Sequence, residues 1–488
     1  MDKTYRKNDI VELNIERAGI NGEGVAHLTN GMTVFVPMTI QGEKVRAKII
    51  LVKKNFAVAK AEEILIPSKD RIEPFCEVYN KCGGCQLQHI NYEKQLTIKT
   101  DLVRETLLKI GKLDVKVNDY VASKSINAYR NKIQLPIGYE NNINKIGFFR
   151  ENSHDIIDIR QCPLHEDWTK KLIEVMRSYL NLTGTKGYNE QQRSGILRHI
   201  VARFLDGKIL ICAVTNAKVL PYTDVLIRLL QDAFLGQWGL YTSVNMRDTN
   251  VIMGDKPVFI GGINCLESEI SGINFNVRID SFLQVNTYIA EAIYNRVFEM
   301  VGQNPPQIII DAYSGIGILT AKLSSLVKLA IGIEIVPQAT ADADETMQKN
   351  GIDNVINITA DCGEFLPKIL AAAQDESFLK NLKNSQNSKK TLISLCEKSS
   401  AALNSPNTQS NITVILDPAR KGCDPRVLSA LTKYPVENII YISCNPATLS
   451  RDLLILSSKY SISSVQPYDM FPQTSHVECV VLMSRMEK

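Results

Sequence analysis

The sequence contains no apolar run of the length needed to cross a membrane, and its first ten residues, MDKTYRKNDI, have no signal-peptide core. We therefore expect a cytoplasmic protein that does not insert into a membrane. Because cytoplasmic thiols stay reduced, the eleven cysteines are expected to be ligands, nucleophiles or buried thiols rather than disulfides. With 488 residues, 44% of them hydrophobic, the chain should form a globular protein of about two to four domains.

The positive charge of the chain is concentrated near its N-terminus. Residues 1–60 carry ten Lys and Arg and six Asp and Glu, and ten minus six equals the net charge of +4 of the whole chain. Glycine turns and runs of apolar or alternating residues predict four strands, at residues 10–15, 32–36, 43–51 and 56–65. We expect a basic β-barrel over residues 1–67 that binds RNA. A solvated barrel without a ligand is the alternative.

Four cysteines form a candidate metal site. Cys76, Cys82 and Cys85 lie within ten residues of one another after a linker at residues 67–74, and Cys162 follows in RQCPL. Four thiolates suit either zinc or an iron–sulfur cluster, and the spacing alone does not choose between the two. The pattern CxxxxxCxxC differs from the CxxxCxxC of radical enzymes, which argues against a radical mechanism.

A further cysteine lies where a predicted strand gives way to a predicted helix. In YISCNPATLSRD (residues 441–452), the strand runs into Cys444, and Asn445 and Pro446 end it. Such a junction lies at the carboxyl edge of a sheet, where open α/β folds place their chemistry. Cys444 is therefore a candidate nucleophile, and a buried structural thiol is the alternative.

The C-terminal two hundred residues alternate strands and helices, with acidic residues at the strand ends. A strand at residues 307–311 leads into DAYSGIGILTAKLSS, Glu334 ends the second strand, and Asp361 follows the third. This order suits a nucleoside-bearing cofactor such as S-adenosylmethionine, because an acidic side chain at such a strand end reaches ribose hydroxyls. The absence of GxGxxG disfavours a dinucleotide. Helix capping is the alternative for each acidic residue taken alone.

Two more acidic residues extend this pattern. Asp417 follows the fourth strand in DPARKG, and an aspartate at this place disfavours amino-group methylation, which uses NPPY. Glu478 lies in FPQTSHVECVVLM, where apolar and polar residues alternate, so a side chain facing water is the alternative to a catalytic one. Residues 375–411 are rich in Ser, Asn and Lys, and we expect an insertion without a chemical role and with a short helix at 391–402.

Several of these stretches resemble known families. GINGEGVAH and FVPMTIQGEKVRAKI resemble the TRAM domain, an OB-like barrel of RNA-modifying enzymes. CGGCQLQH, YRNKIQLPIG, GFFRENSHDIIDIRQCPL and GILRHIVARF resemble the RNA uracil-5-methyltransferases that modify 23S ribosomal RNA. The resemblance implies a barrel at residues 1–67, a strand-rich iron–sulfur and RNA-binding domain at 68–280, and an α/β class I methyltransferase (Rossmann-like) domain at 281–488. It also implies that a helix at 91–111 packs on the catalytic domain.

The resemblance assigns roles to individual residues. The ligands of a 4Fe-4S cluster match Cys76, Cys82, Cys85 and Cys162. The contacts of S-adenosylmethionine match Gln284 (in SFLQVN), Tyr313, Glu334, Asp361 and Asp417. Cys444 matches the nucleophile and Glu478 the general base, and Asp417 is also expected to orient the uracil.

Two further positions carry open questions. The family has DPPRKG where this chain has DPARKG, so Ala419 puts the rigidity of that loop in doubt. Arg198 and His199, in GILRHIVARF, are candidates for RNA contact. A structural arginine on an exposed strand face is the equal alternative, since arginine is mostly exposed.

These assignments fit one reaction. Carbon 5 of uracil is a poor nucleophile until a thiolate adds to carbon 6, and a base must later remove the carbon-5 proton. A stacked uracil must also be flipped out. We predict a monomeric enzyme that methylates carbon 5 of a uridine in 23S ribosomal RNA. A transfer RNA enzyme is disfavoured because it lacks the barrel and the four cysteines, and a non-catalytic RNA-binding iron–sulfur protein is disfavoured by Cys444 and Glu478.

Overall fold

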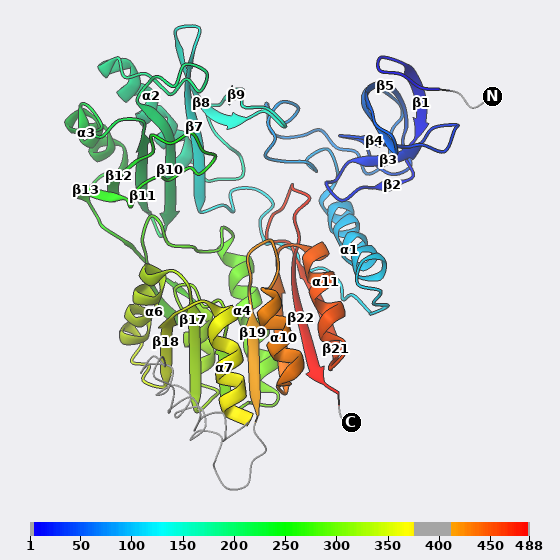
Figure 1. The fold of residues 1–488 in the computed structure, drawn as a ribbon. Coiled ribbons are helices and arrows are strands. Elements are labelled where there is room, and N and C mark those ends of the chain that lie inside the picture. Colours follow the sequence, from blue (N-terminus) through cyan, green and yellow to red (C-terminus); the bar gives the residue numbers. More distant parts are fainter. Residues whose placement is uncertain (1–3, 375–410, 487–488) are drawn as a thin grey trace.

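In the computed structural model, the described residues, 4–374 and 411–486, form three parts that follow one another along the chain (Figure 1). The insertion expected at 375–411 and its helix at 391–402 lie outside the described residues, apart from Asn411. Within the described ranges, no helix is both long enough and apolar enough to span a membrane. The ten cysteines in those ranges are all free thiols.

The N-terminal part is a small β-structure. Its strands are β1 (Ile10–Asn14), β2 (Arg17–Ala18), β3 (Gly24–His27), β4 (Thr33–Val36), β5 (Lys44–Val52) and β6 (Phe56–Ile66), in the order β1-β5-β6-β4-β3-β2. The N–H of Glu16 donates to the carbonyl of Val25, which joins the chain after β1 to β3 and closes the sheet into a barrel. Alternate residues of β5 are buried, so that Val45, Ala47 and Ile49 fill the interior.

A buried ion pair joins the barrel to the segment that follows it. The Glu43 carboxylate is buried and accepts from Arg71 Nε at 2.6 Å, from Arg71 Nη2 at 2.8 Å and from the Ile40 N–H at 2.9 Å. Buried charges are kept only where they are paired and hydrogen-bonded. Ile40 also packs in an apolar cluster with Leu87 and Ile98, which belong to the cysteine segment and to helix α1 (Tyr92–Lys109). The barrel is therefore fixed against both.

The central part is a mixed sheet with helices on one face. Its order is β13-β12-β11-β10-β7-β8-β9, and α2 and α3 pack on it around one apolar core. The elements are β7 (Lys132–Glu140), β8 (Ile143–Phe149), β9 (Ile156–Asp158), α2 (Trp168–Thr183), β10 (Leu197–Leu205), β11 (Lys208–Thr215), α3 (Thr223–Phe234), β12 (Trp238–Val244) and β13 (Val258–Gly262). A hairpin of β14 (Leu266–Ile270) and β15 (Ile273–Val277) follows.

The C-terminal part is a seven-stranded sheet in the order β18-β17-β16-β19-β20-β22-β21, in which β22 runs antiparallel to both neighbours. Its elements are α4 (Thr287–Gly302), β16 (Ile308–Asp311), α5 (Ile318–Ser324), β17 (Leu329–Glu334), α6 (Pro337–Lys349), β18 (Val355–Thr359), α7 (Cys362–Gln374), β19 (Ile412–Leu416), α10 (Pro425–Lys433), β20 (Asn438–Ser443), α11 (Pro446–Leu456), β21 (Tyr460–Tyr468) and β22 (Glu478–Arg485). The central parallel strands β16 and β19 are fully buried and mainly apolar because helices cover both faces. This confirms the predicted α/β class I methyltransferase fold.

Helix α1 lies between the barrel and the C-terminal sheet (Figure 1). Its N-terminus is capped by Asn91, whose side chain accepts from the Lys94 N–H at 2.8 Å. Val103 and Leu107 on its inner face join the core of the methyltransferase part. A segment that precedes the central part in sequence thus forms one wall of the methyltransferase part.

Candidate functional site

The ends of neighbouring strands bring Cys444, Asp417 and Glu478 together. Cys444 directly follows β20, Asp417 directly follows the adjacent strand β19, and Glu478 is the first residue of β22. In the antiparallel pair of β20 and β22, Ser443 lies opposite Cys479, so the next step of the register sets Cys444 opposite Glu478. The fold therefore juxtaposes the residues that the sequence predicts for catalysis.

Burial controls the ionisation of these side chains. It raises the pKa of Cys444 to about 11, with the charge of Glu478 adding to the effect and Arg420 opposing it. Burial and the charge of Asp311 raise the pKa of Asp417 to about 7. Glu478 is only 2% exposed, and burial followed by the charge of Asp417 holds its pKa well above that of a free glutamate. The alternative in which Glu478 faces water is therefore wrong, and a carboxyl group of this kind is suited to proton transfer.

Arg420 links the DPARKG loop to His476. Its Nη2 lies 3.0 Å from both ring nitrogens of His476. Burial and the positive charge of Arg420 lower the pKa of His476 to about 4, so the imidazole is neutral at pH 7 and accepts from the guanidinium. The local sequence around Arg420 does not indicate this role, because only the fold sets the arginine beside Cys444.

Helix α11 holds the DPARKG loop in place. The carbonyl oxygen of Arg420 accepts from Asn445 Nδ2 at 3.0 Å and from Thr448 Oγ1 at 3.2 Å. The fully buried carboxylate of Asp452 accepts from the Cys423 N–H at 2.8 Å. These bonds come from the CNPATLSRD stretch and restrain the loop from outside. The alanine in DPARKG therefore does not leave the loop unsupported.

The glycine turn after β16 lies at the same edge of the sheet as the acidic residues. Gly315 and Gly317 have φ angles of 55° and 78°, in the left-handed region that favours glycine. The Gly315 N–H donates to Glu334 Oε2 at 3.1 Å, so the acidic residue at the end of β17 contacts the turn. Tyr313 is half-buried within this turn, and the backbone carbonyl of Gln284 accepts from Asn131.

Asp361 and Asp311 have structural partners. Asp361 begins α7, where it accepts from the Gly363 N–H at 2.8 Å and from Arg426 Nη2 at 2.9 Å. Helix capping, the alternative considered for each acidic residue, thus describes its contacts. Asp311, the acidic residue that opens the DAYSGIG stretch at the end of β16, is buried and accepts from Thr320 Oγ1 at 2.7 Å, and burial raises its pKa to about 6.

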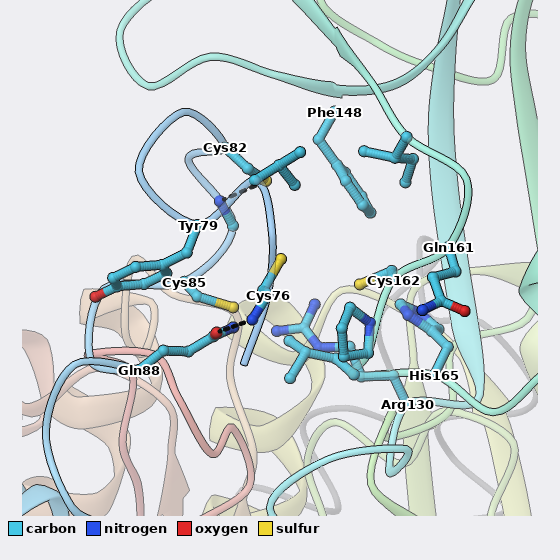
Figure 2. Close-up of a pocket in the computed structure, with 15 residues that line it drawn as sticks. Cys76, Tyr79, Cys82, Cys85, Gln88, Arg130, Phe148, Gln161, Cys162 and His165 are labelled. Atoms are coloured by element: carbon cyan, nitrogen blue, oxygen red, sulfur yellow. Dashed lines mark hydrogen bonds between the residues drawn. The ribbon is translucent and has the colours of Figure 1, made fainter. Parts of the chain in front are cut away.

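The four cysteines predicted as metal ligands line one pocket (Figure 2). The sulfur atoms of Cys76, Cys82, Cys85 and Cys162 turn toward a common space. The Gly84 N–H donates to Cys82 Sγ at 3.4 Å. Burial raises the pKa of Cys85 to about 11 and that of Cys162 to about 12. The positive charge of Arg130, on the pocket wall, partly opposes both increases.

The spacing of these thiols bears on which metal the pocket suits. Among the described residues, no three His, Cys, Asp or Glu side chains are placed to hold a single metal ion. A tetrahedral zinc site needs Zn–S bonds of about 2.3 Å, which would draw all four sulfur atoms to one centre. A 4Fe-4S cluster, in which each of four cysteines binds a different iron, keeps the sulfur atoms farther apart, and the lining of the pocket by four thiols is compatible with either group.

Arg198 does not have the exposure that RNA contact requires. Its side chain is buried and donates from Nη1 to the carbonyl oxygens of Asn245 at 2.7 Å and Arg247 at 2.8 Å. Its guanidinium also lies over the ring of Tyr188, 4.4 Å from the centroid. The arginine is therefore structural and buried, and the expectation that it touches RNA is wrong. His199 is half-buried, and burial lowers its pKa to about 4.

A pocket of about 260 Å³ opens beside Cys444. Three parts of the chain line it: Ile20 and Asn21 of the barrel, Leu102 and Thr106 of α1 with Ile110 at its C-terminal cap, and Arg420, Cys444, Asn445, Pro446, Ala447, Ser475, His476 and Val477 of the methyltransferase part. The approach of the barrel to the candidate nucleophile could not be predicted from the sequence, because nothing in the local pattern of residues 19–24 indicates a distant partner.

Comparisons with known proteins show the family to which this chain is similar. The family model described as tRNA (Uracil-5-)-methyltransferase matches residues 399–486, and the TRAM domain model matches residues 6–61. An uncharacterized RNA methyltransferase of Clostridium acetobutylicum is 38% identical over 99% of this chain and 98% of its own length. A counterpart in Listeria monocytogenes is 35% identical over 98% of each chain.

A solved structure shares the whole fold. The tRNA (uracil-54, C5)-methyltransferase of Pyrococcus abyssi, in complex with S-adenosyl-L-homocysteine, has a TM-score of 0.72 and 24% identity, and the alignment covers 97% of this chain and 100% of that one. Because a transfer RNA enzyme matches nearly the entire chain, the three-part fold does not separate ribosomal from transfer RNA substrates. The family model, the relatives and the fold agree: the chain belongs to the RNA uracil-5-methyltransferase family and is an enzyme of that activity with an N-terminal TRAM domain.

Proposed function

We propose that the protein transfers a methyl group from S-adenosylmethionine to carbon 5 of a uridine in 23S ribosomal RNA, through a covalent bond between Cys444 and the uracil. The observation that carries the proposal is the pairing of β20 with β22, which sets Cys444 opposite the buried Glu478. One side chain is a nucleophile and the other a carboxyl group with a raised pKa, and the reaction needs both.

Each side chain has a defined task. The Cys444 thiol loses its proton to water, Sγ bonds to carbon 6 of uracil, and the electrons of the carbon 5–carbon 6 double bond move to form an enolate. The enolate electrons then bond carbon 5 to the methyl group, whose bond to the sulfonium sulfur breaks, so that S-adenosylhomocysteine is the leaving group. Glu478 removes the proton left on carbon 5, the double bond re-forms, and the bond from carbon 6 to Sγ breaks. Arg420 supports the first step, because its charge lowers the pKa of Cys444.

The glycine turn and the strand ends fit S-adenosylmethionine. A Cβ added at Gly315 would meet no atom within 4 Å, and Ser314 Oγ is buried without a hydrogen-bond partner among the described residues. When bound, the sulfonium supplies an electrophilic methyl group. Glu334 would hold the ribose hydroxyls, as acidic residues at this strand end do. The remaining contacts are assigned to Tyr313, Gln284, Asp361 and Asp417.

The cysteine pocket fits a 4Fe-4S cluster. Four thiols line one pocket, and Arg130 supplies positive charge beside them. Cys76, Cys82, Cys85 and Cys162 would each ligate one iron. Because the segment after Cys85 packs on the methyltransferase part, the cluster would be structural and would not take part in the methyl transfer.

The RNA substrate is decided by one experiment. RNA from a strain that lacks the gene and from its parent is mapped for 5-methyluridine, with ribosomal and transfer RNA separated. We expect one or two 23S positions to lose the modification while transfer RNA keeps it. Transfer RNA is the second candidate, favoured by the whole-chain likeness to the Pyrococcus abyssi enzyme. Loss confined to transfer RNA would select that candidate.

A further inference from the structure

The loop of the barrel between β2 and β3 projects into the pocket that contains Cys444. Ile20 and Asn21, at the tip of this loop, line the pocket together with Arg420 and His476. Apart from Asn21 and the residues at 102–110, all other residues that line the pocket lie more than one hundred positions after Ile20 in the sequence. An RNA-binding module that only added affinity would not need to reach the reacting cysteine.

The loop is rigid. The Gly19 N–H donates to the carbonyl of Glu23 at 2.6 Å, and the Asn21 N–H donates to the Glu23 carboxylate at 2.9 Å. Gly22 has a φ of 85°, and a Cβ at this position would lie 2.7 Å from Leu87 Cδ2. The loop thus packs directly on the segment that follows the cysteine motif. Its tip is held at a fixed place relative to Cys444.

The fixed tip presents an apolar side chain to the pocket. Ile20 is 68% exposed at the tip of the loop. The side-chain amide of Asn21 turns back to Glu23 at 3.5 Å, so Ile20 is the tip residue left facing outward. An isoleucine side chain exposed to water is unfavourable. Covering it with a flat apolar surface, such as the face of a nucleobase, lowers the free energy of the complex.

We infer that Ile20 is a positioning residue that packs against the base next to the target uridine and so keeps the flipped uracil in the pocket of Cys444. The inference rests on the proposed function. Extruding a base breaks its stacking with its neighbours, and apolar side chains that take over a stacking position offset that loss in proteins that unstack nucleic acids. The barrel would therefore contribute to substrate opening as well as to RNA affinity.

The test compares Ile20→Ser with Ile50→Ser. Ile50 is a matched control, because it also lies on the barrel, is 43% exposed and does not line the pocket. The substrate is a transcript that contains the uridine methylated by the wild type. We expect Ile20→Ser to bind this RNA within about twofold of the wild type but to methylate it about tenfold more slowly in a single turnover, since one stacking contact is lost. Ile50→Ser should match the wild type in both measurements.

A second substrate separates stacking from a general defect. In this RNA, each nucleotide adjacent to the target uridine is replaced in turn by an abasic residue, which leaves the uridine without a stacking partner on that side. With one of the two abasic RNAs, Ile20→Ser should recover to within about twofold of the wild-type rate on the same RNA. Equal rates for Ile20→Ser and the wild type on the intact RNA, or a defect that neither abasic RNA relieves, would overturn the inference. A wild-type protein that methylates no RNA would instead reject the proposed function.

Discussion

Gln95 of α1 and Gln473 of the loop before β22 are joined by two reciprocal hydrogen bonds. Gln95 Nε2 donates to Gln473 Oε1 at 3.0 Å, and the Gln473 N–H donates to Gln95 Oε1 at 3.2 Å. Both side chains are buried. The backbone of Gln473 has a φ of 70°, a value that residues other than glycine rarely adopt. The carbonyl of Gln473 accepts from the N–H groups of Gln86 and Leu87, each at 3.0 Å.

These hydrogen bonds connect the loop before Glu478, the candidate general base, to segments that are distant in the sequence. The loop that Gln473 anchors runs through His476 to Glu478, and the bonds from residues 86 and 87 come directly after the last clustered cysteine, Cys85. The position of Glu478 therefore depends on α1 and on the cysteine segment as well as on the sheet.

Replacing Gln95 with leucine should loosen that loop. The substitution leaves the carbonyl oxygens of Leu87 and Ile90, which Gln95 Nε2 now reaches at 3.0 and 2.8 Å, without this donor. We expect the free energy of unfolding in urea to fall by about 2 kcal/mol or more, because buried groups lose their partners. The methylation rate at a permissive temperature should fall as well. Gln348→Leu, an exposed glutamine on α6, is the control and should change neither quantity.

The buried pair of Lys99 and Asp469 should be more important for stability than an exposed pair on the same helix. Lys99 Nζ lies 2.6 Å from Asp469 Oδ1, and the two side chains are 1% and 0% exposed. Lys99→Met leaves the carboxylate buried without its cation, so we expect a loss of about 3–5 kcal/mol in the free energy of unfolding. Lys109→Met, which removes an exposed i,i+4 pair with Glu105, should cost less than about 0.5 kcal/mol. Similar losses for both variants would contradict this ranking.

Protein purified without oxygen should be brown and contain about four iron atoms per chain, as expected for a four-cysteine cluster. Cys82→Ser should lose the colour and most of the iron. Because the cysteine segment bonds to Gln473, it should also lower the melting temperature of the methyltransferase part. Cys212→Ser is the control, since Cys212 is buried in the central sheet and does not line the pocket. Stoichiometric zinc without iron would reject the cluster.

The strand ends were predictable from sequence, but their partners were not. Glu334 ends a parallel strand, and Asp361, Asp417 and Cys444 each come within two residues of the end of one. A buried parallel strand is recognisable in the sequence as an apolar run that ends in a polar residue. Glu478 shows the limit of this reading. The alternation of apolar and polar residues allowed Glu478 to face water. In the structure, β22 lies between two strands and its first four residues are buried.

Contacts between segments far apart in sequence were beyond sequence reasoning. The approach of Ile20 to Cys444 and the hydrogen bonds between Gln95 and Gln473 depend on how the three parts of the protein pack together. The amino-acid composition does not indicate this packing. The prediction that Arg198 contacts RNA was wrong for a different reason. Arginine is usually exposed, but this one is buried by two carbonyl acceptors and the Tyr188 ring, which the frequency of exposed arginine does not anticipate.

The reactivity of Cys444 should rise with pH across the neutral range. Only the thiolate reacts with iodoacetamide, and a pKa raised to about 11 means that its fraction increases about tenfold for each pH unit between 7 and 9. Arg420→Met removes the positive charge that lowers this pKa, so it should slow the labelling at a given pH. Glu478→Gln removes a negative charge that raises it and should speed the labelling. Labelling of Cys444 is followed by mass spectrometry of its peptide. A rate that does not change between pH 7 and 9 would contradict the raised pKa.

The order of bond changes gives the sharpest test of the two catalytic groups. Cys444→Ala removes the addition step, so neither methyl transfer nor a covalent RNA adduct should form. Glu478→Gln spares addition and methyl transfer but removes the base, so the methylated RNA should stay bonded to Cys444. On a denaturing gel with labelled RNA and S-adenosylmethionine, Glu478→Gln should give a slowly migrating adduct, the wild type little, and the double variant none. If Glu478→Gln turns over normally, another group removes the proton. His476 would then be tested first, because its imidazole is neutral at pH 7 and lines the pocket of Cys444.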